Sequence, residues 1–197
     1  MNVLGLDLSL NAPGFCPEPG VGHSMVMSSN DGDRRLVRHR DAAEHYLRQR
    51  QYDLAVIESV PGYMTNTAAL ERVHGVWRES LCRRGVPFIY ITPSSLKLFA
   101  TGHGGADKQA MIDAAVAIGA TPKNDNEADA IWLGEIGLTV LGEHRRPLLG
   151  YQVKALEAMQ QNKNSGIKKC RHGHYCLHNG ARWLHPMGMT VCDKPPR

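Results

Sequence analysis

Apolar residues gather in short unbroken runs along the first half of the chain, and such runs predict buried β-strands. The expected strands cover residues 3–10, 23–28, 34–39, 54–58 and 87–91. The turn signal NDGD at 30–33 separates the second strand from the third. The Pro- and Gly-rich stretch at 11–22 is expected to form a loop.

Apolar residues at helical spacing lie between and after the later strands. The expected helices cover residues 41–51, 67–84, 94–99, 108–118 and 127–141. In the second of these, Leu70, Val73, Trp77 and Leu81 recur at intervals of three or four. Three successive strands, followed by strands alternating with helices, predict an α/β layer fold with a mixed sheet.

The pattern changes after residue 143. Residues 151–161 predict one further helix, and the polar run 160–166 is typical of a linker. From residue 168 onward apolar periodicity is nearly absent, whereas Cys and His are frequent. We therefore expect three parts: a body at 1–143, a helix and linker at 144–167, and a Cys/His-rich tail at 168–197.

Charge is distributed unevenly along these parts. Residues 143–197 carry ten Lys and Arg against three Asp and Glu, whereas residues 1–142 carry 13 against 16. A basic tail on an acidic body predicts that the tail supplies much of any affinity for a polyanion. The alternative is a merely solvated tail.

Composition also bears on the setting of the protein. With 197 residues, 42% of them hydrophobic, the chain can bury one ordinary core. It has no signal-peptide pattern and no apolar run long enough to cross a membrane, and its five cysteines are an odd number. These features predict a cytoplasmic protein with no membrane contact and no disulfide framework.

Three carboxylates interrupt or end the apolar patterns. Asp7 lies inside the first strand, Glu58 ends the run at 54–58, and Asp129 lies near the start of the helix at 127–141. A charge in such a place is costly unless it is paired, and the usual partner of a carboxylate cluster is a hard divalent cation. Acids gathered from two strands and one helix suit two-metal phosphodiester chemistry.

The neighbours of these acids favour a ligand site. Gly5 and Ser9 share one face of their strand with Asp7, so small residues are expected to leave room for a ligand. Glu58 lies at the C-terminal end of its strand, where open α/β sheets place their sites. The alternative for Asp7 is an ion pair with a core Arg or Lys.

Two polar residues precede Asp129 by about one helical turn. Asp125 and Asn126 lie four and three positions earlier, so they reach the same site if the helix begins early enough. Either residue is also a candidate for the helix N-cap.

The order of the motifs resembles one known family. GLD at 5–7, VIE at 56–58, GHGGADK at 102–108 and NEADAIW at 126–132 are similar to the RuvC family of Holliday junction resolvases, within the RNase H-like superfamily. The segment PSSLKLFATG at 93–102 is especially similar to resolvases of phages that infect actinobacteria. The resemblance covers about residues 3–141. It implies a five-stranded mixed sheet flanked by helices, a homodimer, Mg²⁺ or Mn²⁺, and paired nicks across a four-way DNA junction.

By this resemblance Asp7, Glu58 and Asp129 match three of the four acidic positions of the family. The fourth position, one turn before Asp129, is Asp or His in the bacterial enzymes and is Asn126 here. Asn offers a carbonyl oxygen but no charge, and Asp125 is a candidate substitute. The resemblance implies two metal ions about 4 Å apart, which Asp7 on the central strand would bridge.

Basic residues near these motifs are candidates to bind DNA. Lys108 is expected to contact the scissile phosphate and Lys97 a neighbouring one, although each lysine also fits a solvated helix face. His103 lies in the glycine-rich stretch between them, which suits close approach of the backbone to DNA.

The segment before the helix at 67–84 has two possible roles. In the family this region reaches into the junction, so Tyr63 and Met64 are candidates to stack on unpaired bases. They fit equally well in a dimer interface together with Trp77. The helix at 67–84 is the segment that the family uses to dimerise.

The tail has the composition of a metal site. Three cysteines and four histidines lie within 23 residues, and tetrahedral zinc needs four such ligands. The pattern resembles small zinc knuckles appended to phage nucleases. The expected ligands are Cys170, His174, Cys176 and Cys192, with His178 and His185 as rivals of Cys176. The alternative is a disordered basic tail.

The favoured function is therefore a Mg²⁺-dependent endonuclease that resolves four-way junctions. A branched-DNA-binding protein with little or no catalysis remains open, because Asn126 removes a charge, and so does a flap or fork endonuclease. An actin-like sugar or acetate kinase is excluded, since no glycine follows Asp7 closely and the chain is too short for two such lobes.

Overall fold

The computed structural model describes residues 1–60, 67–143, 146–161, 167–169, 175–178 and 183–184 of the chain. Six residues to which the sequence assigns a role lie outside this part: Tyr63, Met64, Cys170, His174, His185 and Cys192.

A five-stranded mixed sheet in the order β3-β2-β1-β4-β5 forms the centre of the fold. Its strands are β1 (Val3–Asp7), β2 (Gly14–Glu18), β3 (Val21–Ser24), β4 (Leu54–Glu58) and β5 (Phe88–Ile91). The first three form an antiparallel meander, and β4 and β5 continue the sheet parallel to β1. The five-stranded mixed sheet is thus confirmed, with β1 at its centre.

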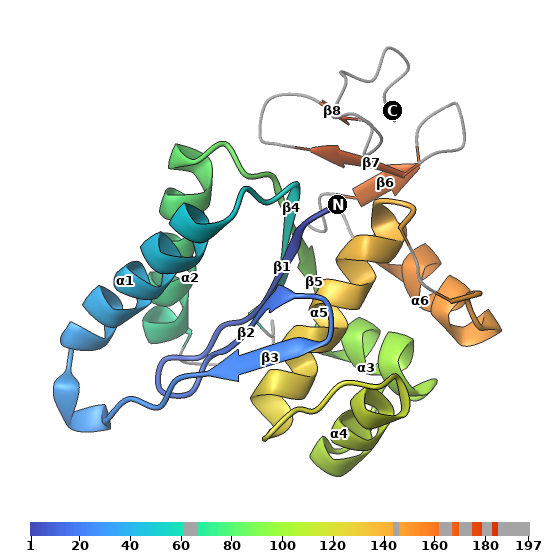
Figure 1. Ribbon diagram of the computed structural model, residues 1–197, viewed down its shortest axis with the longest axis horizontal. Coiled ribbons are helices and arrows are strands. Elements are labelled where there is room, and N and C mark those ends of the chain that lie inside the picture. The colour runs from blue at the N-terminus through green and yellow to red at the C-terminus, as the bar shows by residue number, and fades with distance from the viewer. Residues whose placement is uncertain (61–66, 144–145, 162–166, 170–174, 179–182, 185–197) are drawn as a thin grey trace.

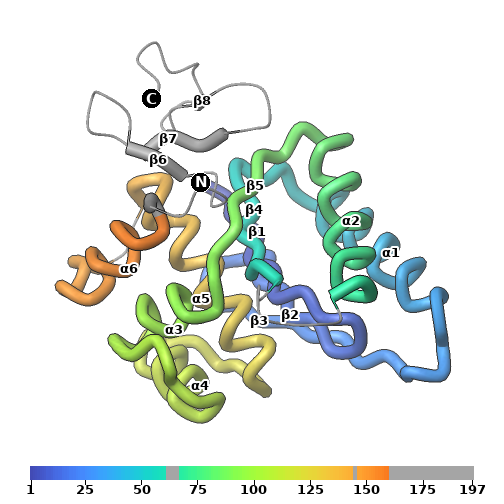
Figure 2. Tube along the Cα trace, turned by 180° about the vertical axis from the view of Figure 1, so that it is seen from behind, coloured from blue at the N-terminus to red at the C-terminus, as the bar shows by residue number. Residues whose placement is uncertain are grey.

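Helices cover both faces of the sheet (Figure 1). The helices are α1 (Arg34–Gln49), α2 (Ala68–Arg83), α3 (Pro93–Thr101), α4 (Lys108–Ala117), α5 (Asp125–Val140) and α6 (Gly150–Gln161). α1 and α2 lie together on one face, whereas α5 crosses the other face with α3, α4 and α6 beyond it, as the view from behind also shows (Figure 2). The sheet therefore separates two hydrophobic cores.

The sequence prediction was wrong for two segments near the N-terminus. Residues 34–39 begin α1 instead of forming a strand, because the buried positions from His39 to Leu47 form one continuous helical face. The stretch at 11–22, expected to be a loop, instead supplies β2, the middle strand of the meander. Pro17 is tolerated in β2 because the pairing with β3 shifts register between Phe15 and Glu18.

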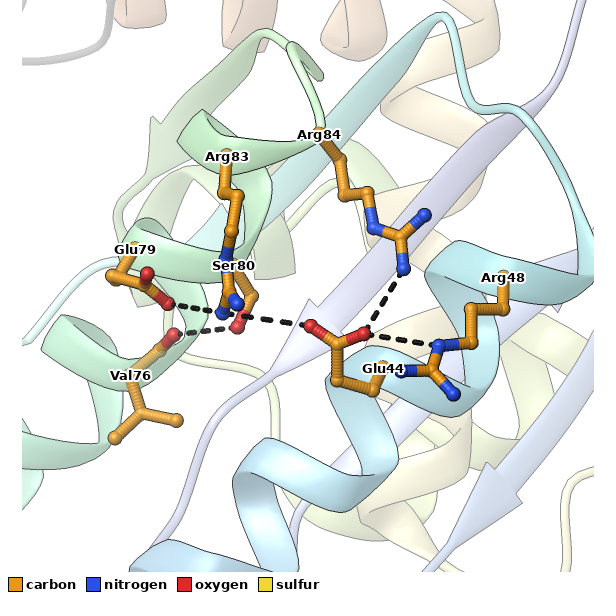
Figure 3. Close-up of polar contacts among 7 residues, drawn as sticks. All are labelled: Glu44, Arg48, Val76, Glu79, Ser80, Arg83 and Arg84. Carbon is orange, nitrogen blue, oxygen red and sulfur yellow. Dashed lines mark hydrogen bonds and ion pairs between the residues drawn. The ribbon is translucent and has the colours of Figure 1, made fainter.

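The two helices of one face are joined by charge at their ends (Figure 3). The Glu44 carboxylate of α1 lies 3.5 Å from Arg83, the last residue of α2, and 3.0 Å from Arg84, the residue that follows it. It also lies 3.2 Å from Arg48 on its own helix. The hydrogen bond from Arg84 and the surrounding arginines hold the pKa of Glu44 below its usual value.

Trp77 belongs to the core between α1 and α2 and not to an exposed face. It is fully buried, and its Nε1–H donates to His39 Nδ1 over 3.2 Å. The expectation that it packs with Tyr63 and Met64 in a dimer interface is therefore wrong for Trp77. Cys82, near the end of α2, is exposed.

A second, three-stranded antiparallel sheet follows α6. Its strands are β6 (Ile167–Lys169), β7 (Tyr175–His178) and β8 (Trp183–Leu184), in that order. Cys176 lies on β7. Across the described ranges, no helix is long and apolar enough to span a membrane.

Candidate active site

Asp7 and Glu58 are neighbours at the C-terminal ends of the inner strands β1 and β4. β1 and β4 pair in parallel with Leu6 opposite Ile57, so the next residue of each strand is one of these acids. Side chains alternate along a strand, and Val3 packs in the core on the α5 face, so Asp7 projects toward α5 as well. Asp7 is only 7% exposed.

The α5 backbone lies directly on the sheet beside these acids. A Cβ atom on Gly5 would lie 2.1 Å from the Ala130 carbonyl oxygen, and one on Gly14 would lie 1.9 Å from that of Asn126. The room left by the small residue beside Asp7 is thus filled by a helix, and not by a ligand as the sequence suggested. This close packing is what brings Asp129 over the end of β1.

The start of α5 decides which polar residues join the site. Asn124 is the N-cap, and its Oδ1 accepts from the Glu127 N–H over 2.9 Å. The expectation that Asp125 or Asn126 caps the helix is therefore wrong. Asp125 instead lies in the first turn of α5, close enough for its charge to raise the pKa values of Asp7 and Asp129.

The acids strongly perturb one another. Burial raises the pKa of Asp7 well above its ordinary value, and the charges of Glu58 and Asp129 raise that pKa further. Asp7 also donates a hydrogen bond to Glu58, and burial is the main reason why the pKa of Glu58 rises to about 7. Burial followed by the charge of Asp125 raises the pKa of Asp129 to about 6. Such a cluster retains protons near neutral pH unless a cation compensates its charge.

Both lysines that the sequence singled out lie beside this cluster. The charge of Lys97 lowers the pKa values of Glu58 and Asp129 against the effect of burial. Lys108 Nζ lies 2.6 Å from Asp125 Oδ2, and this contact raises the pKa of Lys108. His103 is different: its described hydrogen bonds stay within its own turn, to Thr101, Gly105 and Ala106.

The site has the chemistry of a hard-cation site. Asp129 Oδ1 is buried without a hydrogen-bond partner, an arrangement that costs free energy unless something compensates. Within the described residues, no three His, Cys, Asp or Glu side chains are already arranged as ligands of one metal ion. The Asp7–Glu58 hydrogen bond and the Lys108–Asp125 ion pair offset part of the negative charge of the cluster. A set of carboxylate oxygens alone fits Mg²⁺ or Mn²⁺.

One residue at this site has a role that the sequence reasoning missed. Glu127 is 3% exposed, and its carboxylate accepts from Ser24 Oγ over 2.8 Å and from the Lys123 N–H over 2.9 Å. A Glu three positions after an N-cap Asn matches the capping-box pattern, which was the available signal.

Comparison with known proteins places the chain in a family. Residues 21–135 match the family model described as "Crossover junction endodeoxyribonuclease RuvC". Proteins of that name from Mycobacterium avium (strain 104) and Rhodococcus jostii (strain RHA1) are 30% and 29% identical to it over 180 and 178 residues. Each alignment covers 83% of this chain, and they cover 93% and 92% of the two relatives.

Solved structures show the same fold. The Thermus thermophilus RuvC structure has a TM-score of 0.58 at 20% identity, covering 73% of this chain and 98% of that one. T. thermophilus RuvC in complex with Holliday junction substrate has a TM-score of 0.55 at 16% identity, covering 73% and 97%. The chain belongs to the RuvC family of crossover junction endodeoxyribonucleases.

Proposed function

We propose that this protein is a structure-selective DNA endonuclease that resolves four-way (Holliday) junctions by metal-dependent hydrolysis of phosphodiester bonds. The observation that carries the proposal is the convergence of Asp7, Glu58, Asp125 and Asp129 from two parallel strands and one helix. Membership of the RuvC family supports the choice of DNA junction as substrate.

Asp7, Glu58 and Asp129 would hold the divalent cations, Mg²⁺ or Mn²⁺, with two ions in each site. Asp125 would supply the fourth carboxylate, because Asn126 stands at the family position and brings no charge. When bound, the two ions provide an activated water and stabilise the leaving 3′ oxygen. The carboxyl group of Asp7 would give up the proton that it now shares with Glu58.

The two lysines would bind the DNA backbone beside the acids. The charge of Lys97 lowers the pKa values of Glu58 and Asp129, so Lys97 would also attract a phosphate that lies near those acids. Lys108 would exchange its carboxylate partner Asp125 for a phosphate oxygen. His103, Tyr63 and Met64 complete the proposed DNA contacts.

Further parts of the proposal concern assembly and the tail. The protein would act as a homodimer through the outer face of α2, which fits the paired nicks of a resolvase. The tail would bind one Zn²⁺ through Cys170, His174, Cys176 and Cys192, and its basic charge would strengthen DNA binding. A phage of actinobacteria as the source and the cytoplasm as the location belong to the same proposal.

A direct test is cleavage of a synthetic four-way junction in Mg²⁺, beside flap, fork, duplex and single-stranded DNA. The proposal expects symmetric nicks in the junction and little cleavage of the other substrates. Equal cleavage of flaps or forks would favour a broader branch-cutting nuclease. Binding without cleavage in Mg²⁺ or Mn²⁺ would favour a non-catalytic junction-binding protein.

A further inference from the structure

Glu127 is a buried carboxylate that does not join the acidic cluster, although it lies two residues from both Asp125 and Asp129. Its two oxygens are occupied elsewhere: Oε1 accepts from the Ser24 hydroxyl over 2.8 Å, and Oε2 accepts from the Lys123 N–H over 2.9 Å. Side chains two positions apart in a helix point to nearly opposite sides. Glu127 therefore holds α5 from the side away from the acids.

The contacts of Glu127 belong to a closed ring of hydrogen bonds. Asn124 Nδ2 donates to Ser24 Oγ over 3.0 Å, and the Glu127 N–H donates back to Asn124 Oδ1 over 2.9 Å. Ser24 ends the edge strand β3, 100 residues or more before its partners in the chain. The ring thus ties the first turn of α5 to the sheet.

Backbone packing supports the same attachment. A Cβ atom on Gly22 of β3 would lie 2.8 Å from the Glu127 Cβ, so helix and strand touch closely at this point. This contact limits how near the turn can approach the sheet, whereas hydrogen bonds resist movement away from it. A glutamate side chain suits that task because its two oxygens accept from two separate donors, one on β3 and one just before the helix.

The first turn of α5 needs such an attachment for an electrostatic reason. Asp125 lies in this turn and Asp129 in the next, on the side of the helix that faces Asp7 and Glu58. Like charges repel, and the force acts on the end of a helix, where fewer backbone hydrogen bonds hold the chain. The hydrogen bonds of Glu127 to β3 and to Lys123, just before the helix, act against this repulsion.

We propose that Glu127 is a positioning residue that clamps the first turn of α5 to β3 and so keeps Asp125 and Asp129 in place opposite Asp7 and Glu58. This inference rests on the proposed role of those four acids in holding divalent cations. It predicts that the clamp governs how much Mg²⁺ the enzyme needs, and not how it binds DNA.

The test compares Glu127→Ala, Glu127→Gln and Ser24→Ala by the Mg²⁺ concentration that gives half-maximal nicking of a four-way junction. Loss of a residue that orients metal ligands typically weakens metal binding by about 10-fold or more, so Glu127→Ala should raise this concentration by roughly 10-fold. The rate at saturating Mg²⁺ should largely recover, and junction affinity without metal should stay within about twofold. Glu127→Gln keeps one carbonyl acceptor and should lie between Glu127→Ala and the unchanged protein.

Thr139→Ala is the matched control, because the Thr139 hydroxyl donates to the Glu135 carbonyl over 2.8 Å in the last turn of the same helix. An unchanged Mg²⁺ requirement in Glu127→Ala would overturn the proposal, and so would an equal rise in Thr139→Ala at the same loss of melting temperature. If Glu127→Ala does not fold, the same Mg²⁺ requirement is measured for Ser24→Ala, which removes the hydrogen bond from β3 to Glu127. Full activity in Asp129→Asn would contradict the proposed metal site itself, which is a different failure.

Discussion

Asp7 and Glu58 end two adjacent parallel strands, and a hydrogen bond joins their carboxyl groups. Two buried acids can share a hydrogen bond only while one of them keeps its proton. The buried pair therefore needs positive charge to offset its two negative charges. A proton supplies that charge at low pH, and cations would supply it at neutral pH.

The stability of the metal-free protein should fall as pH rises through the pKa values of this cluster. The pKa values of Glu58 and Asp129, about 7 and about 6, lie above the values of about 4 expected in an unfolded chain. The folded state then binds more protons than the unfolded state, so stability is full below the unfolded values and is lost on the way up to pH 8. Thermal unfolding in chelator should show a melting temperature several degrees lower at pH 8 than at pH 6.

Glu58→Gln is the control for this measurement, because it removes one titrating group and keeps the buried His39 and His74. Burial lowers the pKa values of these histidines, so their protonation destabilises the fold as pH falls. Both proteins contain them, so this contribution cancels when their melting temperatures are compared. The fall in melting temperature should be smaller in the variant, and added Mg²⁺ should stabilise the unchanged protein more at pH 8 than at pH 6. If the melting temperatures of the two proteins depended on pH in the same way, the raised pKa values of the buried acids would not be the cause of the loss of stability.

The first turn of α5 offers a test of the fourth metal ligand. If Asp125 supplies the charge that Asn126 lacks, Asp125→Asn should weaken Mg²⁺-dependent nicking by about 10-fold or more. Asn126→Asp should keep cleavage and lower the Mg²⁺ concentration needed for it. Unchanged activity in Asp125→Asn would remove this residue from the site.

Much of this site follows from strand parity. The alternation around Asp7 and the position of Glu58 at the end of its run predict two acids at one sheet edge, and the structure brings them together. Sequence could not predict that Gly5 accommodates the α5 backbone, because that contact depends on how a distant helix crosses the sheet. The Glu127 clamp depends in the same way on Ser24, about 100 residues away.

The errors near the N-terminus have a local cause. Residues 34–39 contain the adjacent apolar pair Leu36 and Val37, which resembles part of a short strand, but the helix period only becomes clear when Ala42, Ala43 and Tyr46 are included. β2 was hidden by its proline and glycine, which are acceptable there only because of a register shift and a closely packed helix.

The proposed dimer can be tested at Gly75. This residue lies exposed on α2, and a Cβ atom added there meets nothing within 4 Å. Gly75→Glu should improve helix propensity, yet a charge buried without a partner in an interface costs about 3 kcal/mol, which weakens dimerisation roughly 100-fold. Light scattering should show a dimer for the unchanged protein, a monomer for Gly75→Glu and a dimer for the control Val37→Glu, whose site on α1 is 57% exposed. A dimer that survives Gly75→Glu would exclude this face.

The tail should be a zinc module whose order depends on the metal. Purified protein is expected to contain about one Zn²⁺ per chain, and Cys170→Ser or Cys192→Ser should release it while the body stays folded. Residues 168–197 carry six Lys and Arg against one Asp, so truncation after Gln161 should weaken junction binding and flatten its dependence on salt. Nicking of saturating substrate should persist. Protein purified under reducing conditions without chelators and found free of zinc would leave only a basic arm.

The central claim is that the cluster at the edge of the sheet performs metal-dependent cleavage. The most direct measurement is nicking and binding of a synthetic four-way junction by Asp7→Asn in Mg²⁺, beside the unchanged protein. Asn preserves the shape of the side chain but replaces the carboxyl group at the centre of the cluster by an amide that cannot ionise. The account predicts that nicking is abolished, while junction affinity measured without metal changes by no more than about twofold, because Asp7 offers DNA no positive charge. Full Mg²⁺-dependent nicking by Asp7→Asn would contradict it.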